Sequence, residues 1–421
     1  MEFESIKRSL LHSIIRVTDL PDHAWRLAQL DLANGGLGLT DTTLICEPAY
    51  LASQMAVESF LRRTMQVSEE TLENSLWFTT LANLKLKFPS HNDAIEQGPK
   101  GLQGRLCKDL YKSRADQVHL EINSDHARFT SQDRATLLSM RNPSTSKWVT
   151  ALPTADLKMN NAEMQIALQA RLLLPHPAIQ PGSCCPHCNH HPFIGAKGEH
   201  MGACPTGTGR RVLHDIMSRE IASLATSAAL IAHLEPHGCF PVLFPNTAVG
   251  LRPDVRIMSD PRLVVPNRDL LLDFVVTRPT TMSNLQHHSD TVAGAALANA
   301  ESSKKTKFQQ VAEANNHTFV PMAFEGPSGR MSDTAGKTIA TLIKAAAECK
   351  GINYSAMSNF WLRRLSVKFQ IYNARIYLEK VSAIATGNNR RQGHVIRDEV
   401  EAIYNERIFV HGAERYAESG I

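Results

Sequence analysis

The spacing of apolar residues divides the chain into a helical first half and a second half in which helices alternate with short strands. Apolar positions recur every three or four residues over residues 6–17, 49–61 and 148–174, as in helices with one buried face. Between the first two, Asn34-Gly35-Gly36-Leu37-Gly38-Leu39 predicts a turn, because its glycines readily adopt positive φ. Residues 88–146 are polar and uneven, which indicates a connector holding one or two helices.

Beyond residue 210 the pattern predicts one α-β-β-β-α-β succession. We expect helices over residues 214–231, 291–315 and 334–349, and strands over 233–236, 251–258, 270–277 and 319–324. The long helix over 291–315 is a crossover, and a crossover joins parallel strands. The expected fold class is therefore α/β, with one mixed sheet that carries helices on its faces.

These patterns predict five regions. They are a helical region over residues 1–90, a helical linker over 91–180, a cysteine- and histidine-rich module over 181–210, an α/β core over 211–350 and a helical extension over 351–421. A chain of 421 residues is long enough for two or three domains of ordinary size.

Composition and charge exclude several classes of protein. Hydrophobic residues make up 43% and charged residues 20% of the chain, as in soluble globular proteins. No apolar run approaches the roughly 20 residues of a membrane helix, and the N-terminus lacks a secretory signal. We therefore expect an intracellular protein without a membrane partner. The formal net charge of +4 permits a polyanionic partner without requiring one.

Two aspartates interrupt strand-like apolar runs. Asp254 follows Arg252 and Pro253, and Asp273 stands inside the apolar run over residues 270–276. Burying a bare carboxylate costs several kcal/mol, so such a group must meet a cation, a donor or water. For Asp254 alone, a turn or strand-end carboxylate after a proline is the commoner explanation. Together the two residues predict a site for a divalent cation.

The helix expected after these strands carries a lysine on its apolar face. That face is formed by Val292, Ala296, Ala300, Lys304, Phe308 and Val311. A charged group on a core-facing stripe is expected only where it snorkels or pairs, and the carboxylates of Asp254 and Asp273 would be its partners. Taken singly, Lys304 is more often a solvated helix residue, since Lys305 and Lys307 lie beside it.

A second cluster predicts a zinc site. The eight cysteines include four between residues 184 and 204, and this clustering favours a metal over a disulfide framework. Three thiolates and one imidazole are the ligands of a closed tetrahedral zinc site, here Cys185, Cys188, His200 and Cys204. Several neighbours stay open as alternatives: Cys184 could replace Cys185, and His187, His190 or His191 could replace His200. Free buried thiols beside a polar loop are the competing interpretation.

The order of elements and motifs is similar to that of restriction-like PD-(D/E)XK nucleases. Arg252-Pro253-Asp254 resembles their first acidic motif, and Asp273 resembles the second. More specifically, nearly the whole chain resembles the C-terminal part of non-LTR retrotransposon polyproteins: a thumb-like region and linker, a CCHC zinc knuckle, and a restriction-like endonuclease. Arg211, His214-Asp215 and the helix Ala300-Glu301 to Lys307-Phe308 carry this resemblance. The gap between Cys188 and His200 is a few residues longer than usual in such knuckles.

The resemblance implies a Mg²⁺-dependent endonuclease that nicks duplex DNA. Asp254 and Asp273 would hold Mg²⁺, with Glu220 as a further carboxylate, and Lys304 would stabilise the transition state with Lys307 as an alternative. Arg211, His214 and Arg252 would contact phosphate or support the site from behind. The family's usual lysine position, two residues after the second acid, is occupied by Val275. Lysines that have moved to the following helix occur in some branches of the superfamily.

The chain contains no Asp-Asp dipeptide, so the paired aspartates that such a polymerase needs are missing. We expect a truncated or separately encoded tail of such an element, active or decayed, located in the nucleus. Its expected partners are duplex DNA, element RNA and an intact reverse transcriptase in trans. Two alternatives remain: a catalytically inactive remnant that binds nucleic acid through its zinc-stabilised fold, and an unrelated zinc-stabilised α/β protein.

Overall fold

A computed structural model describes most of the chain. The described residues are 2–17, 19–66, 68, 70–71, 76–87, 100–177, 179, 182–185, 187–188, 193–207, 209–241, 251–263 and 267–386. The predicted α/β class is confirmed in its coarse form, because the structure combines many helices with a five-stranded mixed sheet and a cluster of cysteine and histidine residues.

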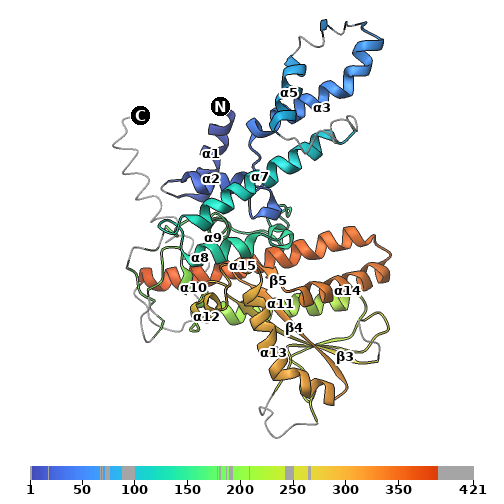
Figure 1. Cartoon of the computed structure of the whole chain (residues 1–421). Helices are drawn as coiled ribbons and strands as arrows, with labels where there is room; N and C mark the ends of the chain where they lie inside the picture. Colours follow the sequence, from blue (N-terminus) through green and yellow to red (C-terminus); the bar gives the residue numbers. More distant parts are fainter. Residues whose placement is uncertain are drawn as a thin grey trace.

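The first half is mostly helical, as the apolar spacing predicts, but of the helix expected over residues 148–174 only Asn161–Arg171 is helical. Its helices are α1 (Glu2–Ile15), α2 (Asp22–Gln29), α3 (Thr42–Arg63), α5 (Leu76–Lys87), α7 (Leu102–Ser124), α8 (Ser131–Met140) and α9 (Asn161–Arg171), with 3-10 turns η1 (Leu32–Asn34) and η3 (Pro143–Ser146). Figure 1 shows α3, α5 and one end of α7 projecting as an arm from the rest of the molecule. The remaining helices share one apolar core, which includes Trp25, Leu27 and Trp148.

The predicted glycine turn follows η1 and is confirmed. Gly35 has a φ of 87°, and a Cβ atom on Gly36 would lie 2.0 Å from the carbonyl oxygen of Leu30, so no other residue fits there. The buried guanidinium of Arg171 donates to the carbonyl oxygens of Gly36 at 2.9 Å and Leu32 at 3.0 Å. The turn is thereby fixed to α9, which leads toward the second half of the chain.

The second half contains the sheet, whose strands follow the chain order. They are β1 (Ala232–Leu234), β2 (Val255–Ile257), β3 (Asp269–Thr277), β4 (His317–Glu325) and β5 (Arg330–Met331). β3 and β4 are parallel and are joined through α13 (Ala295–Ala314), while the other pairs are antiparallel. The predicted crossover helix and mixed sheet are therefore confirmed, and β5 is a short addition that the apolar pattern does not reveal.

Helices cover both faces of this sheet. Alternate residues of β3 point to opposite sides: Leu272 packs in the core shared with α11 (Gly209–Ser227) and α14 (Asp333–Lys350), whereas Leu271 packs against Phe308 of α13. Figure 1 shows α13 beside the strands, with α11 and α14 in a separate layer. A residue of β3 that lies an even number of positions from Leu271 therefore faces α13.

Two predicted elements begin later in the chain than the sequence indicates. The strand expected over residues 251–258 is limited to β2, so Asp254 immediately precedes the strand, because Pro253 has no N–H to donate to a ladder. The helix expected from residue 291 begins after Gly294, which adopts a left-handed conformation. Val292, predicted on the apolar face of this helix, is consequently 55% exposed.

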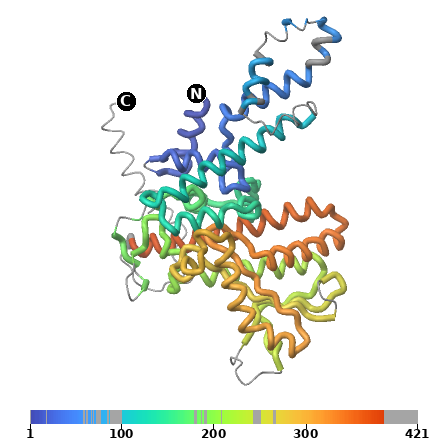
Figure 2. Tube along the Cα trace, in the orientation of Figure 1, coloured from blue at the N-terminus to red at the C-terminus, as the bar shows by residue number. Residues whose placement is uncertain are grey.

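The longest described helix, α15 (Tyr354–Thr386), contacts both the N-terminal helices and the helices that cover the sheet. Figures 1 and 2 show it crossing the middle of the structure, between the N-terminal helices and the sheet. It packs on α9, α11, α14 and the short helix α10 (Glu199–Ala203). Of the region predicted over residues 351–421, the structure describes this helix up to Thr386, and residues 387–421 lie outside the described residues.

Candidate functional site

Asp254 lies at the point where β3 extends past the start of β2. Val255 pairs with Leu272, and β3 then continues to Thr277. The backbone N–H of Phe274 donates to Asp254 Oδ2 at 2.6 Å, and the N–H of Asp254 donates to the carbonyl oxygen of Leu272 at 3.0 Å. These bonds fix the carboxylate of Asp254 beside β3, at the end of its own strand.

Asp273 points to the α13 side of the sheet and meets Lys304. Lys304 Nζ forms an ion pair with Asp273 Oδ2, and the side chains are 24% and 5% exposed, respectively. Burial raises the pKa of Asp273 and the negative charge of Asp254 raises it further, while Lys304 lowers it. The structure therefore brings Asp273 and Lys304 into contact, with Asp254 near enough for its charge to act on Asp273.

His214 reaches the same site from the opposite layer. It lies on α11, and its Nε2 is 3.0 Å from Asp254 Oδ2, while its Nδ1 is 3.1 Å from Asp215 Oδ1. Burial lowers the pKa of His214, but the hydrogen bonds and charges of Asp254 and Asp215 outweigh burial and raise it to about 8. A protonated His214 thus donates to both carboxylates and holds Asp254 in place.

Glu220 does not join the aspartates. Its carboxylate is bound by Arg364 of α15, with Nε–Oε2 at 2.5 Å and Nη2–Oε1 at 3.1 Å. A bidentate guanidinium satisfies both carboxylate oxygens and holds the side chain toward α15. The resemblance implied a metal-side role for Glu220, on the helix before the strands, but a long-range partner on α15 decides where the carboxylate points.

The other basic residues named from the sequence lie around the site without touching either aspartate. Lys307 is exposed, and its Nζ lies 5.0 Å from the ring centroid of Phe308. Arg252 pairs with Glu235 at 2.8 Å. The side chain of Arg211 is 82% exposed and lies 3.9 Å from Asp215, the residue that contacts His214. These side chains are exposed enough to meet a polyanion.

Four of the predicted zinc ligands gather at one point. One ligand atom from each of Cys185, Cys188, His200 and Cys204 lies within 4.8 Å of all the others. Cys188 Sγ is 3.2 Å from His200 Nε2 and 3.4 Å from Cys204 Sγ, and Cys185 Sγ is 3.7 Å from Cys204 Sγ. Zn–S bonds of about 2.3 Å in a tetrahedron place sulfur atoms about 3.8 Å apart, so the cluster has the size of a zinc site. The cluster can bind a metal such as zinc.

Local structure assembles this cluster from two short segments. His200 and Cys204 are four residues apart at α10, and the Cys204 N–H donates to the His200 carbonyl at 2.7 Å, which places both ligands on one side of the helix. Among the alternatives left open by the sequence, Cys184 is exposed and bridges to Phe193, and neither it nor His187 belongs to the cluster. His190 and His191 lie outside the described residues.

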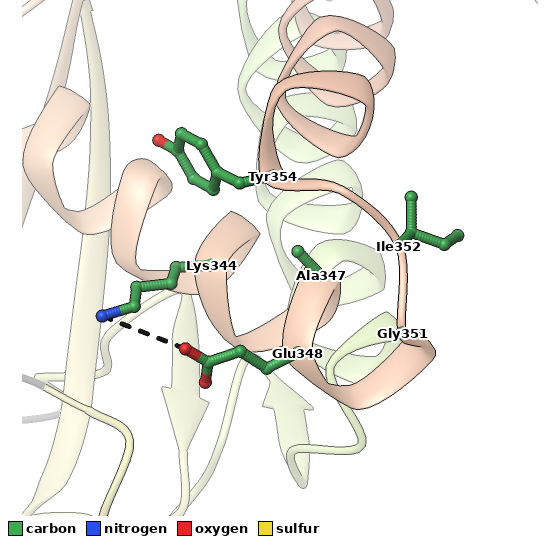
Figure 3. A pocket seen from close by; sticks show the side chains of 6 residues that line it. All are labelled: Lys344, Ala347, Glu348, Gly351, Ile352 and Tyr354. Atoms are coloured by element: carbon green, nitrogen blue, oxygen red, sulfur yellow. Dashed lines mark ion pairs between the residues drawn. The ribbon is translucent and has the colours of Figure 1, made fainter.

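One cavity in the described part of the chain lies away from both sites. It measures about 520 Å³ and occupies the corner between α14 and α15. Figure 3 shows its lining, in which Lys344 and Glu348 face each other at 3.9 Å. None of the candidate residues lines it, so the cavity adds nothing to the proposed chemistry.

Comparison with known proteins assigns neither a family nor a function to these residues. No protein-family model matches the chain, and no curated protein matches it. The resemblance to retrotransposon polyproteins therefore stays a prediction. Among the helices that the structure describes, none is both long enough and apolar enough to span a bilayer.

Proposed function

We propose that this protein is a Mg²⁺-dependent endonuclease that nicks duplex DNA, of the restriction-like type found in retrotransposon polyproteins. One observation carries the proposal: Lys304 reaches from α13 to the carboxylate of Asp273, beside the carboxylate that Asp254 supplies from the neighbouring strand. An ion pair that served only the fold would need Asp273 alone, whereas here Asp254 adds a second carboxylate at the same end of the sheet.

The residues fit a hard divalent cation. Mg²⁺ takes oxygen ligands, keeps several waters and is commonly bound through one or two carboxylates. Asp254 and Asp273 offer such oxygens, and burial and the charge of Asp254 raise the pKa of Asp273 although Lys304 pairs with it. His214 and the N–H of Phe274 both bind Asp254 Oδ2, which leaves Asp254 Oδ1 as the oxygen available to an ion.

The protein's own groups would share the chemistry as follows. Asp254 and Asp273 would hold Mg²⁺, which on binding supplies polarisation of the scissile phosphate and a lower pKa for the attacking water. Lys304 would place its ammonium beside the phosphate oxygens as charge builds on them. His214 would hold Asp254 from behind, while Arg252 and Lys307 would meet backbone phosphates of the duplex.

We further propose that the cluster of Cys185, Cys188, His200 and Cys204 binds Zn²⁺ in a structural role. The cluster offers four protein ligands, which leaves no open position for substrate. Ile194 and Met201 are buried in the core shared with α11 and α15, and bound metal would add to this stability by joining the two ligand segments.

A second candidate function is nucleic-acid binding without cleavage. Val275 favours it, because this residue fills the strand position where the resembling nucleases carry a lysine. In that case the exposed basic residues and the zinc module would bind nucleic acid, and the aspartates would be remnants of a lost site.

Nicking of supercoiled plasmid tests the proposal. The wild type should convert the plasmid to the open-circle form with Mg²⁺ and not with EDTA. Asp254→Asn should abolish nicking, because it removes one carboxylate charge at nearly constant volume. Asp333→Asn is the matched control, since Asp333 is exposed at the start of α14 and should leave nicking unchanged. Plasmid binding without nicking by the wild type would instead support the second candidate.

A further inference from the structure

Lys380 is a buried lysine that lies against the zinc ligands. It belongs to the last turns of α15 and is 2% exposed. Its Nζ donates to Cys204 Sγ at 3.5 Å and to the carbonyl oxygen of Thr206. Burial of an ammonium costs several kcal/mol unless a negative charge compensates it. The carbonyl of Thr206 carries no net charge, so the sulfur of Cys204 is the compensating group among these two partners.

The surrounding loop is shaped around this end of α15. A Cβ atom on Gly207 would lie 2.8 Å from Lys380 Nζ, and Gly207 has a φ of 107°, so glycine is required there. The neighbouring side chain of Glu379 accepts a hydrogen bond from the N–H of Gly209 at 3.1 Å. A Cβ atom on Gly202 would lie 2.8 Å from the hydroxyl of Tyr377. The zinc module and α15 are therefore closely fitted at this contact.

We propose that Lys380 is part of the zinc centre, where its ammonium compensates the charge of the metal-bound thiolates and ties α15 to the module. The inference rests on the proposed zinc binding. Three thiolates and one imidazole around Zn²⁺ carry one net negative charge, and one buried ammonium neutralises it. Groups just outside the ligands typically change metal affinity 10- to 100-fold. Lys380 is a positioning residue in this sense, since it acts on Cys204 and not on the metal.

Competition with a chromogenic zinc chelator tests the inference on the full chain. Lys380→Met should weaken zinc binding by about 10- to 100-fold, while Lys380→Arg, which keeps the charge, should bind nearly as tightly as the wild type. Lys344→Met is the matched control, because the side chain of Lys344 is 70% exposed on α14. It should leave zinc affinity unchanged.

Substitution of Co²⁺ for Zn²⁺ gives a second test. If Lys380 only stabilised the fold, its replacement would not change the absorption spectrum of the bound metal. Loss of the positive charge beside Cys204 should shift the thiolate-to-Co²⁺ charge-transfer absorption of Lys380→Met to longer wavelength, and Lys380→Arg should restore it. If Lys380→Met does not fold, Lys380→Gln takes its place against Lys380→Arg, since glutamine keeps a donor and removes the charge.

The outcomes separate this inference from the proposed zinc site. Wild-type affinity and spectrum in the uncharged variants would overturn the role of Lys380 and leave the zinc site standing. A wild type that binds neither Zn²⁺ nor Co²⁺ would overturn both, because the ammonium would then face a neutral thiol.

Discussion

Replacing Lys304 with methionine tests whether this lysine belongs to the proposed active site or is an ordinary surface residue of the helix. The change removes the ammonium from the ion pair with Asp273 and keeps most of the apolar side chain. Lys305→Met is the matched control one residue away. The side chain of Lys305 is 49% exposed, and its Nζ lies 3.8 Å from Glu301, as in a surface ion pair.

The two substitutions should differ in both stability and rate. Removing one partner of a fully buried ion pair costs about 3–5 kcal/mol. Lys304 is partly exposed, and solvent screening reduces the expected cost to about 1–3 kcal/mol. Loss of the pair at Lys305 should cost only a few tenths of a kcal/mol. A charged group that stabilises a transition state contributes about 10²- to 10³-fold in rate, so nicking by Lys304→Met should fall by that factor.

Urea unfolding and plasmid nicking measure these two effects. Mg²⁺ should also raise the melting temperature of Lys304→Met more than that of the wild type, because no ammonium then competes for the carboxylates. Equal loss of nicking in both variants would refute the assignment of Lys304. So would a Lys304→Met protein that keeps its full nicking rate.

Three further predictions concern other parts of the molecule. Cys188→Ser should release zinc and lower the melting temperature, as measured by metal analysis and calorimetry; an unchanged melting temperature would contradict a structural metal. Glu220→Gln should weaken the pair with Arg364 and cost about 1–3 kcal/mol in urea unfolding, yet leave Mg²⁺-dependent nicking in place; lost nicking in a folded variant would return Glu220 to the site. Burial lowers the pKa of His119 from 6.5 to about 4, so the folded state keeps it neutral while the unfolded state takes up a proton below pH 6.5. Stability should therefore fall by about 3 kcal/mol as pH drops from 6.5 to 4, and His119→Gln should lessen this fall; the same acid sensitivity in both proteins would contradict it.

Periodicity was sufficient to predict the sheet and its crossover helix. The alternation along β3 and the apolar stripe on α13 both depend on local repeats of two and of three to four residues, which a single sequence displays. The same stripe placed Lys304 toward the sheet, because Phe308 lies one turn further along the helix and packs on Leu271. The four residues of the cluster that can bind a metal could also be named from their residue types and spacing.

Contacts between residues that are far apart in the chain could not be predicted from the sequence. Glu220 pairs with Arg364, a residue 144 positions away, and no local pattern signals that contact. The sequence left open whether His214 contacts phosphate or supports the site from behind, and its position on Asp254 depends on how α11 packs on the sheet. The adjacent Asp215 was the one available signal, since an acidic neighbour often orients a histidine. Lys380 carried no signal at all in the sequence.

Whether Asp254 and Asp273 hold one divalent cation can be seen in a crystal soaked in Mn²⁺, which binds oxygen ligands as Mg²⁺ does and scatters anomalously. We expect an anomalous peak bound by carboxylate oxygens of both Asp254 and Asp273, with Lys304 displaced from its ion pair or beside the ion. No peak at these residues at millimolar Mn²⁺, or a peak bound by one aspartate alone, would contradict it.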